Sequence, residues 1–180
     1  MTAEPVEARE ALVASLIELD HHVGRLGWEQ PARLFALVHS ADLLAREPQL
    51  AEQLGVTGVD DLVPGALSSI EQEGFNPTGD LDLPAVLARV MWPEEVDGCA
   101  LSMVQTFLAK EHEGQIPEDP DLAAEFVQNH PERQELRLVA GVLRDGTQHA
   151  VARLASHREE LLGGPDLAPG VLAALATTLK

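Results

Sequence analysis

The chain has 180 residues, of which 45% are hydrophobic, and a formal net charge of −18 at pH 7. This length and apolar content predict one folded domain, residues 1–180, and argue against intrinsic disorder. The excess of carboxylates opposes binding to the phosphates of nucleic acids and to anionic membrane surfaces, so neither is expected as a partner. The same charge favours solubility and would suit a basic partner.

The sequence predicts a cytoplasmic protein. Its one cysteine, Cys99, excludes an intrachain disulfide and fits a reducing compartment. The first residues, "MTAEPVEAREA", are acidic where a signal peptide would be basic. No apolar run approaches the roughly 18 residues that a membrane-spanning helix needs.

The first half of the chain predicts a helix, a strand and a second helix. Residues 5–26 carry Leu12, Leu16, Leu19, Val23 and Leu26 at helical spacing. Residues 32–38 include the continuously apolar "LFALV", which favours a buried strand, although the same stretch also fits a helix and the sequence leaves both open. A helix is expected from residue 41, with Ser40 as its N-cap, until Pro48 interrupts it.

The middle of the chain alternates short elements with turns. Residues 66–73 are polar at alternate positions, as in an edge strand, and 74–80 have turn composition. A short helix is expected over 82–92 and a strand over 99–109. Residues 111–121, "EHEGQIPEDPD", have the composition of an acidic loop, within which Asp119 and Pro120 mark the start of a helix that ends near residue 130. Residues 168–180 predict a closing helix.

A β-hairpin is expected over residues 136–154, with Asp145 and Gly146 as a two-residue turn. On that pairing Val142 faces His149 and Ala140 faces Val151. Both faces of the ribbon would be apolar, so both need a cover.

We assign the two faces of this hairpin to different covers. The face with Val142 and Val151 is expected to pack against helices of the same chain. The other face carries small side chains that would admit a second copy, and we predict a homodimer interface there, formed by Val139, Gly141, Ala150 and Ala152. On this basis Val151→Asp should unfold the protein, whereas Val139→Asp should only produce a monomer.

The expected order is α-β-α-β-α-β-α-β-β-α, with no internal repeat. It predicts the α+β class, with a single antiparallel sheet of about five strands and helices packed on it. The order of the strands within the sheet does not follow from the sequence.

The segments "WPEEVDGCALSM", "PERQELRLVAGVLRDGTQHAVARL" and "GPDLAPGVLAALATTL" carry a resemblance to a known group of proteins. With them, the chain resembles a family of uncharacterised actinobacterial proteins of similar length, from "GWEQPARLFALV" to the C-terminus. The family has no known activity, so the resemblance implies no catalytic residues. It does imply a cytoplasmic, stand-alone domain.

Glu18 and His22 are four residues apart on the first predicted helix, a spacing that can chelate a metal ion. A third ligand is needed, and the spacing does not select one from His39, His112, His130, His149 and His157. The alternative is a pair of solvated surface side chains, and we expect no metal or other cofactor.

Two further residues, Cys99 and His149, have side chains that can take part in catalysis. Cys99 shares the apolar face of its predicted strand and follows Asp97, whose charge disfavours a thiolate, so a buried structural thiol is expected. His149 lies mid-strand and would suit a general base, but a partly buried histidine with one hydrogen bond explains it equally. Neither the nucleophile elbow nor the phosphate-binding loop motif is present.

The function favoured by the sequence is therefore a non-enzymatic, protein-binding or chaperone-like module that forms a homodimer. One alternative is a small enzyme or metal-binding protein that uses His22, His149 or Cys99. Another is a small-molecule pocket between the sheet and the helices around Trp28 and Trp92.

Overall fold

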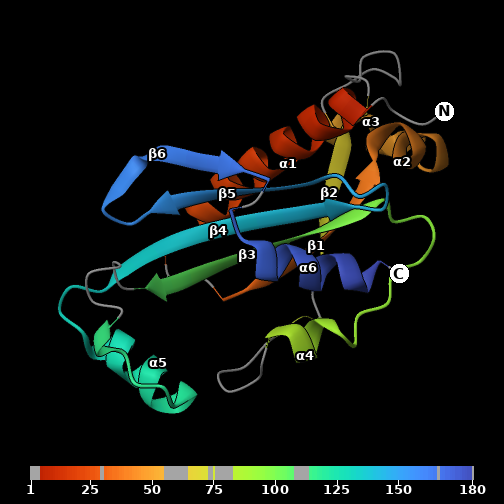
Figure 1. Cartoon of the computed structure of the whole chain (residues 1–180). Helices are drawn as coiled ribbons and strands as arrows, with labels where there is room; N and C mark the ends of the chain where they lie inside the picture. Colours follow the sequence, from red (N-terminus) through yellow and green to blue (C-terminus); the bar gives the residue numbers. More distant parts are fainter. Residues whose placement is uncertain are drawn as a thin grey trace.

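The computed structural model describes residues 5–28, 31–54, 65–72, 75, 83–107, 114–165 and 167–179. Its core is an antiparallel sheet of six strands in the order β2-β1-β3-β4-β5-β6, with helices on both faces (Figure 1). The elements in chain order are α1 (Pro5–Arg25), β1 (Arg33–His39), α2 (Ser40–Arg46), the 3-10 turn η1 (Pro48–Leu50), α3 (Ala51–Leu54), β2 (Leu67–Glu71), α4 (Leu83–Leu87), β3 (Gly98–Phe107), α5 (Pro120–Asn129), β4 (Gln134–Leu143), β5 (Gln148–Leu154), β6 (His157–Gly164) and α6 (Pro169–Thr178).

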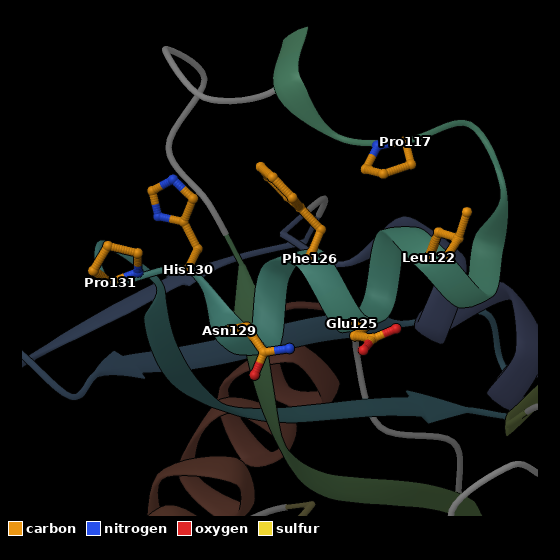
Figure 2. A pocket seen from close by; sticks show the side chains of 7 residues that line it. All are labelled: Pro117, Leu122, Glu125, Phe126, Asn129, His130 and Pro131. Atoms are coloured by element: carbon orange, nitrogen blue, oxygen red, sulfur yellow. The ribbon is translucent and has the colours of Figure 1, made fainter.

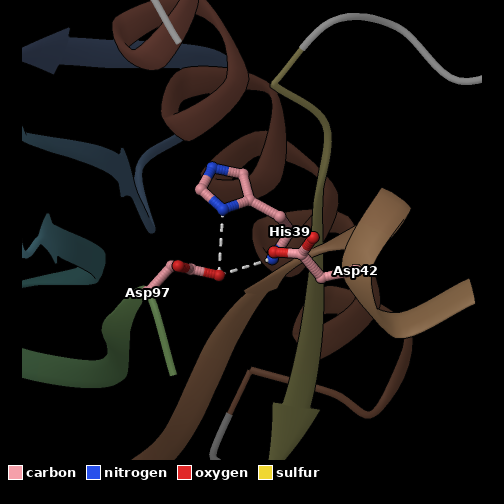
Figure 3. Close-up of side chains that lie close together, drawn as sticks. All are labelled: His39, Asp42 and Asp97. Atoms are coloured by element: carbon pink, nitrogen blue, oxygen red, sulfur yellow. Dashed lines mark hydrogen bonds and ion pairs between the residues drawn. The ribbon is translucent and has the colours of Figure 1, made fainter. Parts of the chain in front are cut away.

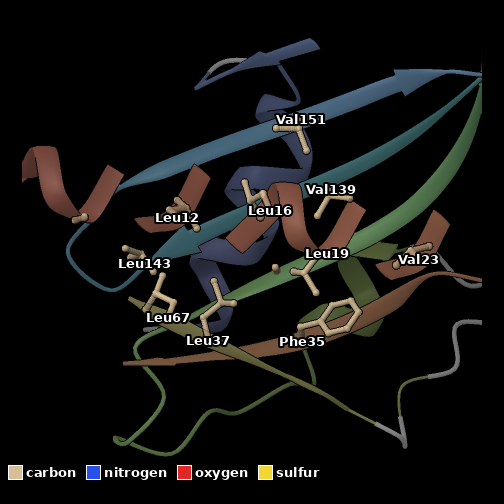
Figure 4. Packing of buried hydrophobic residues seen from close by; sticks show 12 residues of the cluster. Leu12, Leu16, Leu19, Val23, Phe35, Leu37, Leu67, Val139, Leu143 and Val151 are labelled. Carbon is tan, nitrogen blue, oxygen red and sulfur yellow. The ribbon is translucent and has the colours of Figure 1, made fainter. Parts of the chain in front are cut away.

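Helix α1 covers one face of the sheet. Leu26, which the sequence also places in the apolar stripe, follows the last residue of the helix and is 47% exposed. The other four residues of that stripe, Leu12, Leu16, Leu19 and Val23, are at most 3% exposed. Figure 4 shows these side chains directed at the strands, where they meet Phe35, Leu37, Leu67, Val139, Leu143 and Val151. Each such aliphatic side chain contributes about 1.5–3 kcal/mol on burial, so this stripe anchors α1 to the sheet.

Helices α6 and α4 cover the opposite face. Leu172 and Leu175 of α6 and Leu87 of α4 are at most 1% exposed. They pack on side chains that alternate along the strands with those under α1, namely Leu34, Cys99, Leu101, Leu138, Ala140, Val142, Ala150 and Ala152. The sheet therefore has an apolar core on each side within one chain.

The predicted α+β class is confirmed, and so are the helices at both ends of the chain. The strand expected over 32–38 is observed at 33–39, and the edge strand expected over 66–73 is observed at 67–71. The helix expected over 82–92 is shorter, and Ser40 does not cap α2 with its side chain but bonds to Ser68 Oγ at 2.7 Å. The turn expected at 74–80 lies outside the described residues apart from Phe75. The sheet has a sixth strand, β6, that the sequence analysis did not predict.

The strand pairing expected for the hairpin is wrong by one residue. Leu143 and Thr147 close the turn, so the loop has three residues, with Gly146 at φ 96°. This is the three-residue hairpin that places a glycine in the left-handed region. Val139 consequently pairs with Val151, and Ala140 with Ala150. A one-residue slip moves every side chain of β5 to the other face, so Val151 and Val142 lie on opposite faces.

The four residues predicted as a dimer interface do not share an open face. Val139 is fully buried under α1, and a Cβ added at Gly141 would lie 2.9 Å from Leu16 Cδ2, also on α1. Ala150 and Ala152 lie on the other face, in the core beneath α6. A second copy would reach these residues only if α1 or α6 left the sheet, so the hairpin supplies no argument for a dimer.

Candidate functional site

Helix α5 is built by local signals that the sequence shows. The side chain of Asp119 accepts hydrogen bonds from the backbone N–H groups of Asp121 (2.9 Å) and Leu122 (3.4 Å), and Pro120 occupies the first turn. Both features are typical of a helix N-terminus. The helix ends at His130, which has an extended backbone and precedes Pro131. It lies at the end of the sheet where β3 leads to β4, apart from α1 and α6 (Figure 1).

A groove of about 470 Å³ runs along α5, and its walls are mostly apolar. Figure 2 shows Leu122, Phe126 and His130 projecting from the same side of the helix, with Pro117 next to Leu122 at one end. Phe126 and His130 are in ring contact, with centroids 5.5 Å apart. The complete lining is Pro117, Leu122, Glu125, Phe126, Asn129, His130 and Pro131. All of these belong to one segment, so among the described residues no other element contributes a wall.

The groove combines exposed apolar side chains with acidic surroundings. Leu122 is 54% exposed, more than the other large apolar side chains of the described regions except Met91. Residues 114–132 contain five carboxylates, at positions 118, 119, 121, 125 and 132, and no lysine or arginine. Apolar surface of this kind on a soluble protein marks a place where another molecule can dock.

A second cluster joins the end of β1 to the start of β3. His39 Nδ1 lies 3.0 Å from Asp97 Oδ2, and the same oxygen accepts the backbone N–H of His39 at 2.8 Å. Asp42, on α2, completes a group whose potential ligand atoms lie within 4.8 Å of one another (Figure 3). These residue types can hold a metal ion. The contacts between His39 and Asp97 also give each residue a polar partner and connect β1 to the segment before β3.

The predicted ligand pair Glu18 and His22 lies on the exposed side of α1. The grouping of three potential ligands that the described residues form is the one at His39, and it includes neither Glu18 nor His22. The structure thus places this pair at the solvated surface of the helix.

Cys99 is fully buried beneath α6, as the strand pattern predicted. Its Sγ lies 3.5 Å from Thr178 Oγ1 and 3.7 Å from the carbonyl oxygen of Leu175. Burial raises the pKa of the thiol from 9.0 to about 11, although Thr178, Arg144 and Trp92 each oppose the rise. A neutral, inaccessible thiol is a poor nucleophile.

His149 is half-buried on β5, on the α1 side of the sheet. Burial lowers the pKa of His149 below 6.5, and the positive charge of Arg9 adds to this effect. The two tryptophans do not share a pocket: Trp28 Nε1 donates to Glu135 Oε2 (2.9 Å) near α1, whereas Trp92 Nε1 donates to Thr178 Oγ1 (2.9 Å) on α6.

The sequence predicts helix α5 but not its groove. The available signal was the pair Leu122 and Phe126, one helical turn apart, in a helix that also carries the acidic side chains of Asp121 and Glu125. The His39 cluster gave no comparable signal, because Asp97 is distant in sequence and reaches His39 only through the pairing of β1 with β3.

A family model described as "PPA1309-like protein" matches residues 12–180, from the first buried leucine of α1 to the end of α6. The chain belongs to the PPA1309-like family. The match confirms the resemblance that the sequence shows. The family is named after a Propionibacterium protein and has no known activity. No curated protein and no solved structure matches the chain. None of the helices in the described ranges is long and apolar enough to cross a membrane.

Proposed function

We propose that this PPA1309-like protein is a non-enzymatic protein-binding module. Its α5 groove would hold a short partner segment that has one or two bulky apolar side chains flanked by lysine or arginine. The observation that carries the proposal is the exposure of Leu122 beside Phe126, in a groove that the described chain leaves open. An amphipathic segment inserted into an apolar groove is a common mode of peptide recognition.

The charge around the groove selects the partner. Glu118, Asp119 and Asp121 precede or begin α5, and Glu125 lines the groove itself. Opposite charges across an interface accelerate encounter and suppress binding of wrong partners. A basic segment is therefore favoured over an acidic one, and the affinity should weaken as salt concentration rises.

The test is a selection of short random peptides displayed against the full chain. We expect the enriched peptides to combine bulky apolar residues with lysine or arginine. Leu122→Glu should weaken their binding by about tenfold or more, since few interface residues carry most of the affinity. Phe126→Ala should have a similar effect.

Leu162→Glu is the matched control, because Leu162 is a leucine of similar exposure (47%) on strand β6. It introduces the same charge far from the groove and should leave the affinity unchanged. Peptides that bind wild type and Leu122→Glu equally well would contradict the proposal, and so would a selection that enriches acidic sequences.

A homodimer and a cytoplasmic location belong to the same proposal. The single cysteine supports the location. The outer strands of the sheet, β2 and β6, offer its two edges to a second copy, although charged side chains such as Arg158 and Glu159 on β6 disfavour edge pairing. Light scattering during size-exclusion chromatography measures the oligomeric state directly, and the mass of a dimer would support the proposed homodimer.

A further inference from the structure

Four of the chain's ten arginines line one cleft, although the chain as a whole carries a charge of −18. The cleft has a volume of about 360 Å³ and lies where the end of α1 meets β4, β5 and β6. The arginine cleft, as we call it, is bordered by Arg25, Arg137, Arg153 and Arg158 together with Asp20 and Trp28. Four guanidinium groups of the same charge repel one another, so their placement at one cleft calls for negative charge between or beside them.

Asp20 accounts for two of the four arginines of the arginine cleft. Arg137 and Arg153 are directly opposite each other on β4 and β5, a pairing of like charges that would destabilise the sheet by itself. Asp20 is 1% exposed and separates them: its Oδ1 accepts from Arg137 Nε at 2.9 Å, and its Oδ2 accepts from Arg153 Nη2 at 2.8 Å. One carboxylate thus holds two guanidinium groups.

Arg137 has donors left over. The residue is 6% exposed, and its Nε is used by Asp20. Its Nη1 and Nη2 groups, which border the cleft, have no hydrogen-bond acceptor among the residues that the structure describes. Arg153 differs, because its Nε and Nη2 bind Asp20 and its Nη1 binds the carbonyl of Arg158.

The neighbours of Arg137 hold its guanidinium in place. Its Cζ lies 5.2 Å from the centre of the Trp28 ring, and the ring is fixed by the hydrogen bond to Glu135. A Cβ added at Gly24 would lie 3.0 Å from Arg137 Nη2, so glycine leaves room for this group. Arg158 adds a second cation over the Trp28 ring, 4.8 Å from its centre.

The charges around the arginine cleft do not balance. Four guanidinium groups and one carboxylate give a formal excess of three positive charges, which Glu135 at the rim lowers to two. Among the described residues, no carboxylate forms an ion pair with Arg25 or Arg158. Arg25 and Arg158 are exposed, whereas Arg137 is buried and has unused donors, and an anion would stabilise a buried cation of this kind.

We propose that the arginine cleft binds a phosphate group, carried by a small phosphate monoester. Arg137 would donate its free Nη groups to the phosphate oxygens, and Arg158 and Arg25 would supply the remaining charge. Guanidinium groups match phosphate oxygens in geometry as well as in charge. The site lies on the α1 side of the sheet and shares no residue with the α5 groove, so it goes beyond the proposed peptide binding.

A small ligand fits better than a polymer. The volume is at the lower end of the range for small-molecule pockets. Nucleic acids need basic groups spread along a surface, whereas four arginines gather at this cleft and the chain as a whole has 30 acidic residues against 12 lysines and arginines.

The experiment follows the indole N–H resonances in a two-dimensional NMR titration. Inorganic phosphate, glycerol phosphate and phenyl phosphate are added separately, against sodium chloride of equal ionic strength. We expect Trp28 to shift saturably while Trp92, which lies on the other face, stays in place. Esters that bind at least as tightly as inorganic phosphate would identify a monoester site, whereas inorganic phosphate alone would identify a site for the free ion.

Variants locate the binding. Arg158→Gln and Arg25→Gln leave the buried Asp20 contacts intact and should each weaken phosphate binding about tenfold. Arg46→Gln removes the same charge from α2 and should have no effect. The proposal is overturned if the Trp28 shift with phosphate equals that with chloride, or if Arg46→Gln weakens binding as much as Arg158→Gln.

Discussion

Asp20 on α1 and Arg137 on β4 form a buried ion pair, with a distance of 2.9 Å between Asp20 Oδ1 and Arg137 Nε. The two residues are 117 positions apart in the sequence, and their side chains are 1% and 6% exposed. The pair therefore fixes the end of α1 to the centre of the sheet and holds Arg137 at the arginine cleft.

We predict that Asp20→Asn lowers the free energy of unfolding by about 3 kcal/mol or more, because it leaves two guanidinium groups without their shared carboxylate. Urea denaturation measures the change. The control is Glu71→Gln, which breaks the exposed Arg33–Glu71 pair (2.9 Å) and should cost less than about 1 kcal/mol. Equal losses in the two variants would show that burial of Asp20 adds nothing.

Val139→Asp and Val151→Asp should both unfold the protein. The two valines pair across β4 and β5 under α1 and are 0% and 3% exposed. An unpaired carboxylate there costs several kcal/mol, a large part of the stability of a domain. Circular dichroism checks the result, with Ile70→Asp on the exposed edge strand β2 as the tolerated control. A folded Val139→Asp monomer would contradict the burial of Val139 by α1.

The stability should fall between pH 9 and pH 11 because of Cys99. Its pKa is raised to about 11 in the folded chain, so the unfolded chain loses this proton first as the pH rises. The stabilisation that the protonated, buried thiol gives the folded chain is complete below pH 9 and is lost as the pH rises toward 11. The free energy of unfolding should fall by about 3 kcal/mol over this range. The absence of tyrosine and the presence of only two lysines limit competing titrations. Cys99→Ala should flatten the curve, and an unchanged slope would refute this origin.

We expect no dependence of folding on a metal ion. His39 Nδ1 lies 3.0 Å from Asp97 Oδ2, which also accepts the backbone N–H of His39, so these two residues bond to each other without a cation. The melting temperature should be the same with a chelator or with added zinc. A zinc-dependent rise in that temperature that is lost in His39→Ala would instead establish a site at His39, Asp42 and Asp97.

The sequence predicted most helices and strands because their signals are local. The stripe of α1 and the cap at Asp119 depend on neighbouring residues, and both are confirmed. The hairpin register failed because Asp145-Gly146 fits two turn types, and the choice depends on one added residue in the loop. That residue reversed the face of every side chain on β5.

Strand β6 was missed for a related reason. It is an edge strand whose residues are mostly exposed, so it has no alternation of apolar and polar positions. Its place in the sheet comes from pairing with β5, for example Val151 with Gly163. The arginine cleft depends on the same long-range pairing, since only the sheet and α1 bring Asp20, Arg137 and Arg158 together.

The α5 groove tests the proposed function most directly, through hydrogen–deuterium exchange of the full chain with and without a selected basic peptide. Protection should be concentrated in residues 117–131, the segment that contains every residue of the groove lining, and the exchange of β6 should be unchanged. Leu122→Glu should remove the protection at the same peptide concentration. Protection located on another surface, with residues 117–131 unaffected, would contradict the assignment of α5 as the binding site.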